Sequence, residues 1–157
     1  MENEEVKQEL SVVEESNVMD LVSFRNSSNV DVGTFTNITD SKEMFNYSNN
    51  IDFKLNDVVG EKIRFTKVLI RRFVKPIDEP ITNEETGEII DSEVKISCVL
   101  IDSEGKAYAT GSKMFTNKLV NYLVDYNGAK NLDKGIEIEI TKVNTPTGNK
   151  ALSFKLL

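Results

Sequence analysis

The sequence predicts an all-β fold with one helix set among its strands, and two observations predict it. Five segments alternate their side chains with the period of two that marks a strand with one buried face. These segments are residues 62–75, 94–101, 106–112, 136–143 and 151–156. Residues 113–127 instead repeat apolar side chains at spacings of three and four, which is typical of an amphipathic helix.

The first strand changes phase along its length. Ile63 and Phe65 alternate as core residues, but Val68 and Ile70 fall in the opposite phase. A β-bulge near Thr66 and Lys67 would bring all four apolar side chains to one face. The outward set would then be Lys62, Arg64, Lys67, Leu69, Arg71 and Phe73.

The second and third strands form a hairpin. Its turn, residues 102–105, ends in Gly105, which can adopt the positive φ that a tight turn needs. The returning strand carries small residues on one face and larger polar ones on the other. The small residues are Ala107, Ala109 and Gly111, and the larger ones are Lys106, Tyr108, Thr110 and Ser112. We interpret the small face as a core face beneath the helix, so that Tyr108 points outward.

Shorter signals mark the connections. Asp40 or Ser41 is expected to cap a short helix, and Ser112 to cap the long one, which Gly128 would follow as its C′ residue. Residues 76–93 contain two prolines and a cluster of acids, which favours a long acidic loop or a small hairpin. A hairpin loop over 144–149 joins the last two strands.

The element order is strand, strand, strand, helix, strand, strand. This order predicts a five-stranded OB-fold-like barrel (β-β-β-α-β-β), in which the second and third strands typically form the binding face. We assign residues 33–157 to this domain. Residues 1–32 hold eight acids and two bases, whereas the rest of the chain holds 18 acids and 17 bases. The sequence therefore predicts a flexible acidic N-terminal arm on a nearly neutral domain.

Composition excludes several kinds of chemistry. The chain has no His and one Cys, so it offers neither a Cys/His zinc site nor a histidine-based triad. Its single Cys98 cannot form an internal disulfide and is expected to be buried. No apolar run approaches the roughly 20 residues of a membrane span. We predict a protein that is not an enzyme, with no cofactor, no metal and no membrane partner.

Cations and aromatic side chains gather on the outward faces of the first three strands. Cations suit phosphates and aromatic rings suit unstacked bases, so this face predicts a nucleic-acid site. The predicted site residues are Lys62, Arg64, Lys67, Arg71, Phe73, Lys95, Lys106 and Tyr108.

Three short segments carry a resemblance to a known family. They are residues 101–113, Lys42 to Asn46, and Thr147 to Lys150 before the last strand. They resemble segments of single-stranded-DNA-binding proteins of tailed phages of Gram-positive hosts, which serve protein-primed replication. The resemblance covers about residues 41–157 and implies a coat for single strands, with Tyr108 matching a tyrosine linked to DNA binding. The acidic arm and the longer acidic 76–93 loop depart from that family.

Two functions follow as hypotheses. The first is a sequence-tolerant single-stranded-DNA-binding protein that coats and protects strands exposed during phage DNA replication, in the cytoplasm of the bacterial host. The alternative is an OB-fold protein-docking module, a replication or virion accessory factor, which the near-neutral domain and the acidic loop favour. Replication proteins and a second copy of the chain are expected partners in addition to single-stranded DNA.

Overall fold

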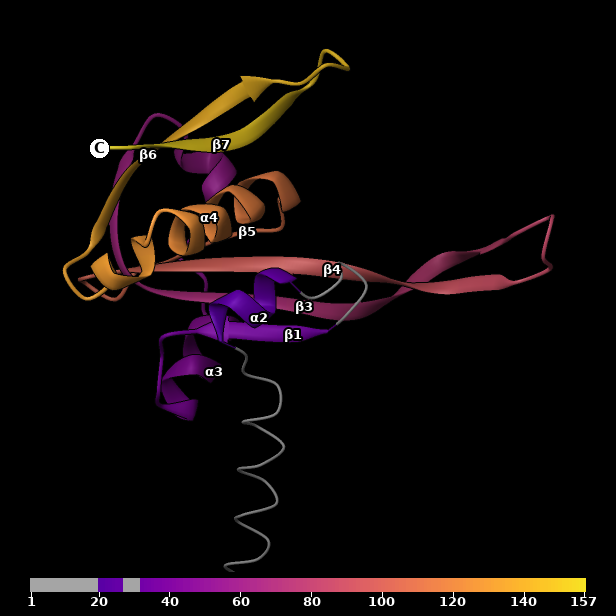
Figure 1. Cartoon of the computed structure of the whole chain (residues 1–157), viewed down its shortest axis with the longest axis horizontal. Helices are drawn as coiled ribbons and strands as arrows, with labels where there is room; N and C mark the ends of the chain where they lie inside the picture. The colour runs from indigo at the N-terminus through magenta and orange to yellow at the C-terminus, as the bar shows by residue number, and fades with distance from the viewer. Residues whose placement is uncertain (1–19, 27–31) are drawn as a thin grey trace, which may run out of the picture.

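Seven strands form one mixed sheet in the computed structural model, which describes residues 20–26 and 32–157 (Figure 1). The strands are β1 (Gly33–Thr36), β2 (Phe53–Lys54), β3 (Lys62–Thr82), β4 (Ile89–Asp102), β5 (Ala107–Thr110), β6 (Ile136–Asn144) and β7 (Lys150–Leu156). The helices are α2 (Leu21–Asn26), α3 (Ser41–Asn49) and α4 (Lys113–Asp125), with short 3-10 helices η1 (Leu55–Val58) and η2 (Gly128–Asn131). The fold is mostly β, as predicted, and the described residues hold three α-helices. Helix α4 is the predicted long helix, and α3, whose N-cap is Asp40, is the predicted short one, whereas α2 was not predicted.

The predicted element order is present, but the sheet does not close. The order of neighbouring strands is β2-β5-β4-β3-β6-β7, and β1 pairs with β3. A closed barrel would join β5 to β7. Within the described residues β5 instead pairs on its other side with β2, in parallel, and β7 pairs with β6 alone. The closed five-stranded barrel is therefore corrected to an open mixed sheet.

Strand β3 contains the bulge that the sequence predicts. Its register with β4 shifts between Phe65, opposite Asp102, and Lys67, opposite Ile101. The first part of β3 pairs with β6, and the part beyond the bulge pairs with β1. Because one residue is inserted, the apolar side chains on both sides of the bulge face the same core.

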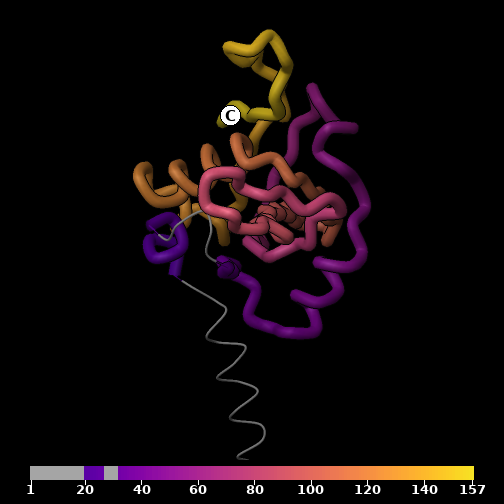
Figure 2. Tube along the Cα trace, turned by 90° about the vertical axis from the view of Figure 1, so that its right-hand side faces the viewer, coloured from indigo at the N-terminus to yellow at the C-terminus, as the bar shows by residue number. Residues whose placement is uncertain are grey.

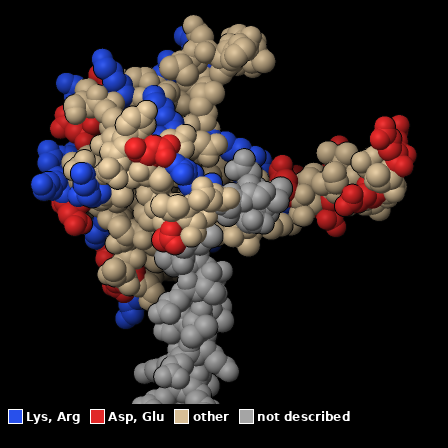
Figure 3. Space-filling view, viewed as in Figure 1, with Lys and Arg blue, Asp and Glu red and all other residues tan. Residues whose placement is uncertain are grey.

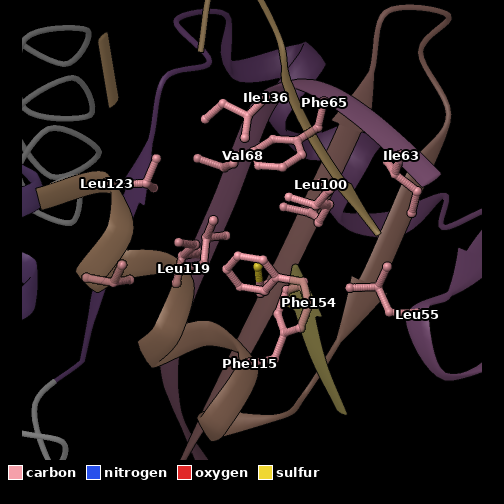
Figure 4. Close-up of a cluster of buried hydrophobic side chains, with 14 of the residues drawn as sticks. Leu55, Ile63, Phe65, Val68, Leu100, Phe115, Leu119, Leu123, Ile136 and Phe154 are labelled. Atoms are coloured by element: carbon pink, nitrogen blue, oxygen red, sulfur yellow. The ribbon is translucent and has the colours of Figure 1, made fainter. Parts of the chain in front are cut away.

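The main core lies between the sheet and helix α4 (Figure 4). Phe65 and Val68 from β3 and Leu100 from β4 are fully buried, as are Phe115 and Leu119 from α4. The rings of Phe115 and Phe154 meet edge to face, with centroids 5.0 Å apart. In Figures 1 and 2 helix α4 lies between the long strands and the β6–β7 hairpin, so one helix buries apolar side chains from both parts of the open sheet.

The other face of the sheet holds a second, smaller core, and it overturns the predicted orientation of β5. Ala107 lies opposite Ile101 and Ala109 opposite Val99 on this face, whereas Tyr108 lies opposite Leu100 on the α4 side. Met44 and Tyr47 of α3 pack against this second core. The small residues of β5 do pack closely against another element, as predicted, but that element is α3 and not α4. The predicted orientation of β5 was wrong because its partner β4 is buried on both faces. Residues 98–101 of β4 are all apolar, so the sequence does not show which face of β5 meets α4.

Part of the predicted arm belongs to the domain. Residues 21–26 form α2, in which Leu21 and Phe24 are buried in the main core. The Arg72 guanidinium lies 4.1 Å from the Phe24 ring centroid and donates a hydrogen bond to the Phe24 carbonyl. Arg25 of α2 forms an ion pair with Asp125 of α4. The prediction of a flexible arm is therefore wrong for residues 21–26, while residues 1–19 and 27–31 lie outside the described residues.

The ends of α4 confirm one predicted cap and correct the other. The Ser112 hydroxyl accepts a hydrogen bond from the Phe115 amide, 3.2 Å away, as an N-cap. At the other end Asn127, not Gly128, has the left-handed conformation, with φ 56°. Gly128 is required for another reason, since a Cβ there would lie 2.3 Å from the Tyr122 ring.

We expect Phe115→Ala to lower the free energy of unfolding by about 3–5 kcal/mol, because a fully buried ring would leave a cavity. Its neighbour Met114 is 47% exposed, so Met114→Ala should change stability by less than about 0.5 kcal/mol. Urea unfolding followed by circular dichroism measures both. Equal losses in the two variants would contradict the core described above.

Candidate nucleic-acid interface

A shallow groove of about 720 Å³ crosses the sheet face that carries the second core, beyond that core. Strands β3, β4 and β5 and the β2–η1 segment supply its walls. The lining residues are Lys54, Asn56, Phe73, Val74, Lys75, Pro76, Lys95, Ile96, Ser97, Ala109, Thr110 and Gly111. We call it the sheet groove.

Lysines give the sheet groove a positive charge. Lys54, Lys75 and Lys95 are all exposed, and the described lining contains no Asp or Glu. Lys95 lies 3.1 Å from Glu93, an exposed pair that water screens, whereas Lys54 and Lys75 form no ion pair with any described residue. The groove can therefore attract an anion along its length.

Phe73 supplies an aromatic surface in the same groove. It is half-buried and lies directly opposite Lys95 on the neighbouring strand. Ala109 of β5 and Gly111, just after that strand, line the groove, where larger side chains would occupy its volume. An aromatic ring beside spaced cations is the arrangement that binds a base and its neighbouring phosphates.

Arg71 does not line this groove but lies beside it on the same face of the sheet. It is exposed and lies opposite Ser97, which lines the groove, two positions before Phe73 on the same strand. The structure therefore brings together Arg71, Phe73 and Lys95 of the predicted site.

The cations nearer the start of β3 contact other parts of the protein and lie outside the sheet groove. Lys67 forms an ion pair with Glu43 of α3, which raises the Lys67 pKa, and its ammonium lies 5.9 Å from the Tyr47 ring centroid. Arg64 donates a 2.6 Å hydrogen bond to the Lys134 carbonyl. Lys62 lies opposite Glu139, and Arg64 opposite Glu137. None of these three cations lines the sheet groove.

Lys106 and Tyr108 also lie away from the sheet groove. Lys106 is 3.4 Å from Glu104 in the β4–β5 turn, and this contact raises the Lys106 pKa. The Tyr108 ring stacks on Phe53, with centroids 5.2 Å apart, and packs against the main core. Burial raises the Tyr108 pKa, and its hydroxyl lies 3.4 Å from an Asp102 carboxylate oxygen. The prediction that Tyr108 points outward is therefore wrong, since it lies on the α4 side of the sheet.

Sequence reasoning missed two groove lysines for different reasons. Lys75 shares the phase of Arg71 and Phe73 on β3, so the alternation could have identified it. Lys54 sits in a strand of two residues, which has no readable period. Only the parallel pairing of β2 with β5 places it beside the groove.

The described residues contain no exposed thiol, no cluster suited to hold a metal ion and no membrane-spanning helix. Cys98 is buried, and burial raises the pKa of its thiol to about 12. No group of three or more His, Cys, Asp or Glu side chains in residues 20–26 and 32–157 is arranged to hold a metal ion. None of the described helices is long and apolar enough to span a membrane.

Comparisons with known proteins identify no relative. The chain matches no protein-family model, no curated protein and no solved structure.

We expect Tyr108→Ala to reduce the free energy of unfolding by about 1–3 kcal/mol, because it removes both the stack on Phe53 and contacts with the main core. The neighbouring Lys106→Ala should leave stability unchanged, since that side chain is exposed. Chemical denaturation without any ligand measures both variants. A fully stable Tyr108→Ala protein would show that the ring is a surface residue, as the sequence predicted.

Proposed function

We propose that this chain binds single-stranded DNA in the sheet groove, without sequence preference and without catalysis. The observation that carries the proposal is the combination of Lys54, Lys75 and Lys95 with Phe73 in one open groove. Cations neutralise phosphates and release their counterions, while an aromatic ring stacks on any base. Both contributions are independent of sequence, which suits a protein that covers whatever strand is exposed.

The arrangement of elements supports the same proposal. The order β3-β4-β5-α4-β6-β7 corresponds to that of an OB fold, and we interpret the sheet as an open variant of it. OB folds typically bind oligonucleotides on their second and third strands. The corresponding strands here are β4 and β5, and both line the sheet groove.

The biological setting is part of the proposal. The resemblance of residues 41–157 to single-stranded-DNA-binding proteins of phages supports a role in covering strands during phage replication, in the cytoplasm of a bacterial host. Tyr108, the residue matched to a DNA-binding tyrosine in that family, is assigned here to packing, because its ring stacks on Phe53.

A protein-docking function remains the second candidate, and one observation favours it. Strands β3 and β4 continue beyond the body as an exposed acidic hairpin, which a single-stranded-DNA site does not need (Figure 1). Binding of labelled oligo-dT, measured by fluorescence anisotropy, separates the two functions. Micromolar or tighter binding with little competition from duplex DNA supports the first, and no binding at low salt supports the second.

We expect Lys75→Ala and Lys95→Ala each to reduce the slope of log affinity against log salt by about 0.7, because each removes one phosphate contact on a single strand. Lys130→Ala is the matched control, since Lys130 is exposed on η2 and lies outside the groove lining. A salt titration of poly-dT binding measures all three. Unchanged slopes in the groove variants would exclude the sheet groove as the site.

We expect Phe73→Ala to weaken oligo-dT binding by about 1–3 kcal/mol while leaving the salt slope nearly unchanged, because it removes stacking and no charge. Phe45→Ala is the matched control, since Phe45 is 67% exposed on α3 and does not line the groove. Anisotropy titrations at two salt concentrations distinguish stacking from charge. If both Phe variants bind as the unmodified protein does, Phe73 does not contact bases.

A further inference from the structure

The open side of the sheet leaves a second groove, between α4 and the β6–β7 hairpin. Its volume is about 1140 Å³, and its surface is mostly apolar. The residues that line it are Met114, Asn117, Lys118, Asn121, Tyr122, Tyr126, Thr141, Lys142, Val143, Ser153, Phe154, Lys155 and Leu156. We call it the α4–β7 groove.

Large apolar side chains are exposed along this groove. Met114 is 47% exposed, Val143 41% and Leu156 43%, while Tyr126 at the end of α4 is 76% exposed. An apolar surface that elements from two parts of the fold share is typical of an interaction site. Tyr126 lies at the end of the segment, residues 113–127, in which the sequence predicts an apolar helix face, and it lines the groove.

One lysine occupies a backbone acceptor at the centre of the free edge of β7. The Ile140 backbone bonds to Gly60 and Glu61, so its partner Phe154 directs its own backbone groups to the free edge of β7. The Lys118 ammonium donates to the Phe154 carbonyl and, at 2.9 Å, to the Ser153 hydroxyl. The groove is therefore suited to receive side chains rather than an added strand.

The charge of the α4–β7 groove has one sign. Its described lining contains Lys118, Lys142 and Lys155 and no Asp or Glu. Lys142 and Lys155 are exposed, and neither forms an ion pair with any described residue, although Lys155 lies opposite Glu139 on β6. An occupant that combines apolar side chains with carboxylates fits this surface best.

The chain itself presents such an occupant. Residues 76–93, the distal ribbon, contain seven acids and no Lys or Arg. The acids are Asp78, Glu79, Glu84, Glu85, Glu88, Asp91 and Glu93. Ile81 and Ile90 lie opposite each other across the ribbon and are 59% and 44% exposed. Figure 3 shows acidic side chains along the ribbon and at its tip.

The distal ribbon cannot fill the groove of its own molecule. Residues 72–76 pair in continuous register with β4, and the register shifts between Pro76 and Ile81 within the ribbon. The ribbon extends away from the rest of the sheet (Figure 1). A two-stranded ribbon is marginally stable alone, and its exposed isoleucines gain from burial against another surface. A distal ribbon that occupies this groove must therefore come from another molecule.

We propose that the distal ribbon of one copy docks in the α4–β7 groove of a second copy. Ile81 and Ile90 would contact the apolar surface around Met114 and Leu156. The ribbon carboxylates would pair with Lys142 and Lys155 at the rim. This contact uses neither the lysines nor the phenylalanine of the sheet groove, so it is independent of the proposed DNA site.

Sedimentation equilibrium of the full chain without DNA, from about 1 to 100 µM, tests the proposal. The ribbon variant E84K/E85K/E88K and the groove variant K142E/K155E should each weaken self-association by at least about tenfold. An equimolar mixture of the two variants should restore association, because the reversed charges are again complementary. The control K130E/K134E, with exposed lysines outside the groove, should associate as the unmodified chain does.

Three results would overturn the proposal. The first is a monomer over the whole concentration range. The second is association that neither charge reversal weakens. The third is association that disappears on removal of residues 1–19 but survives the ribbon reversal, which would make that acidic segment the occupant. Lys75→Ala and Lys95→Ala should leave association unchanged, so this contact and the DNA site can fail separately.

Discussion

The bulge in β3 is the constraint on which the rest of the structure depends. Strand β3 pairs with β4, β6 and β1, so its register sets the positions of these three strands. Without the inserted residue, either the pair Ile63 and Phe65 or the pair Val68 and Ile70 would leave the main core. The same bulge keeps Arg71 and Phe73 on the opposite face, where the sheet groove lies.

Both faces of the sheet are buried near the centre, and this decides where ligands can bind. Helix α4 covers one face, and α3 covers the other around Leu69 and Ile101. Lys67, although it lies on the predicted binding face, is held by Glu43 beneath α3. In the described part of the chain the sheet groove opens on that face beyond α3, which moves the candidate site along β3 and β4 to Phe73, Lys75 and Lys95.

Open edges distinguish this domain from a closed barrel. Because β2 occupies the free side of β5, β7 does not pair with β5, and among the described strands it pairs with β6 alone. The same feature produces the α4–β7 groove and leaves its apolar side chains exposed. Lysines line both grooves without Asp or Glu in their described linings, while the distal ribbon carries acids and no Lys or Arg.

The sequence by itself determined the five main strands, the Ser112-capped helix, the turn at Gly105 and the bulge near Thr66, because periodicity and turn chemistry are local properties. Only the tertiary structure decided which way Tyr108 points, that α2 joins the core, and that the sheet stays open. Two apolar phases in β4 made the faces of β5 ambiguous, and burial of Leu21 and Phe24 depends on the distant residue Arg72 and on α4. Lys54 reaches the sheet groove through a parallel pairing with residues more than 50 positions away, which no local pattern encodes.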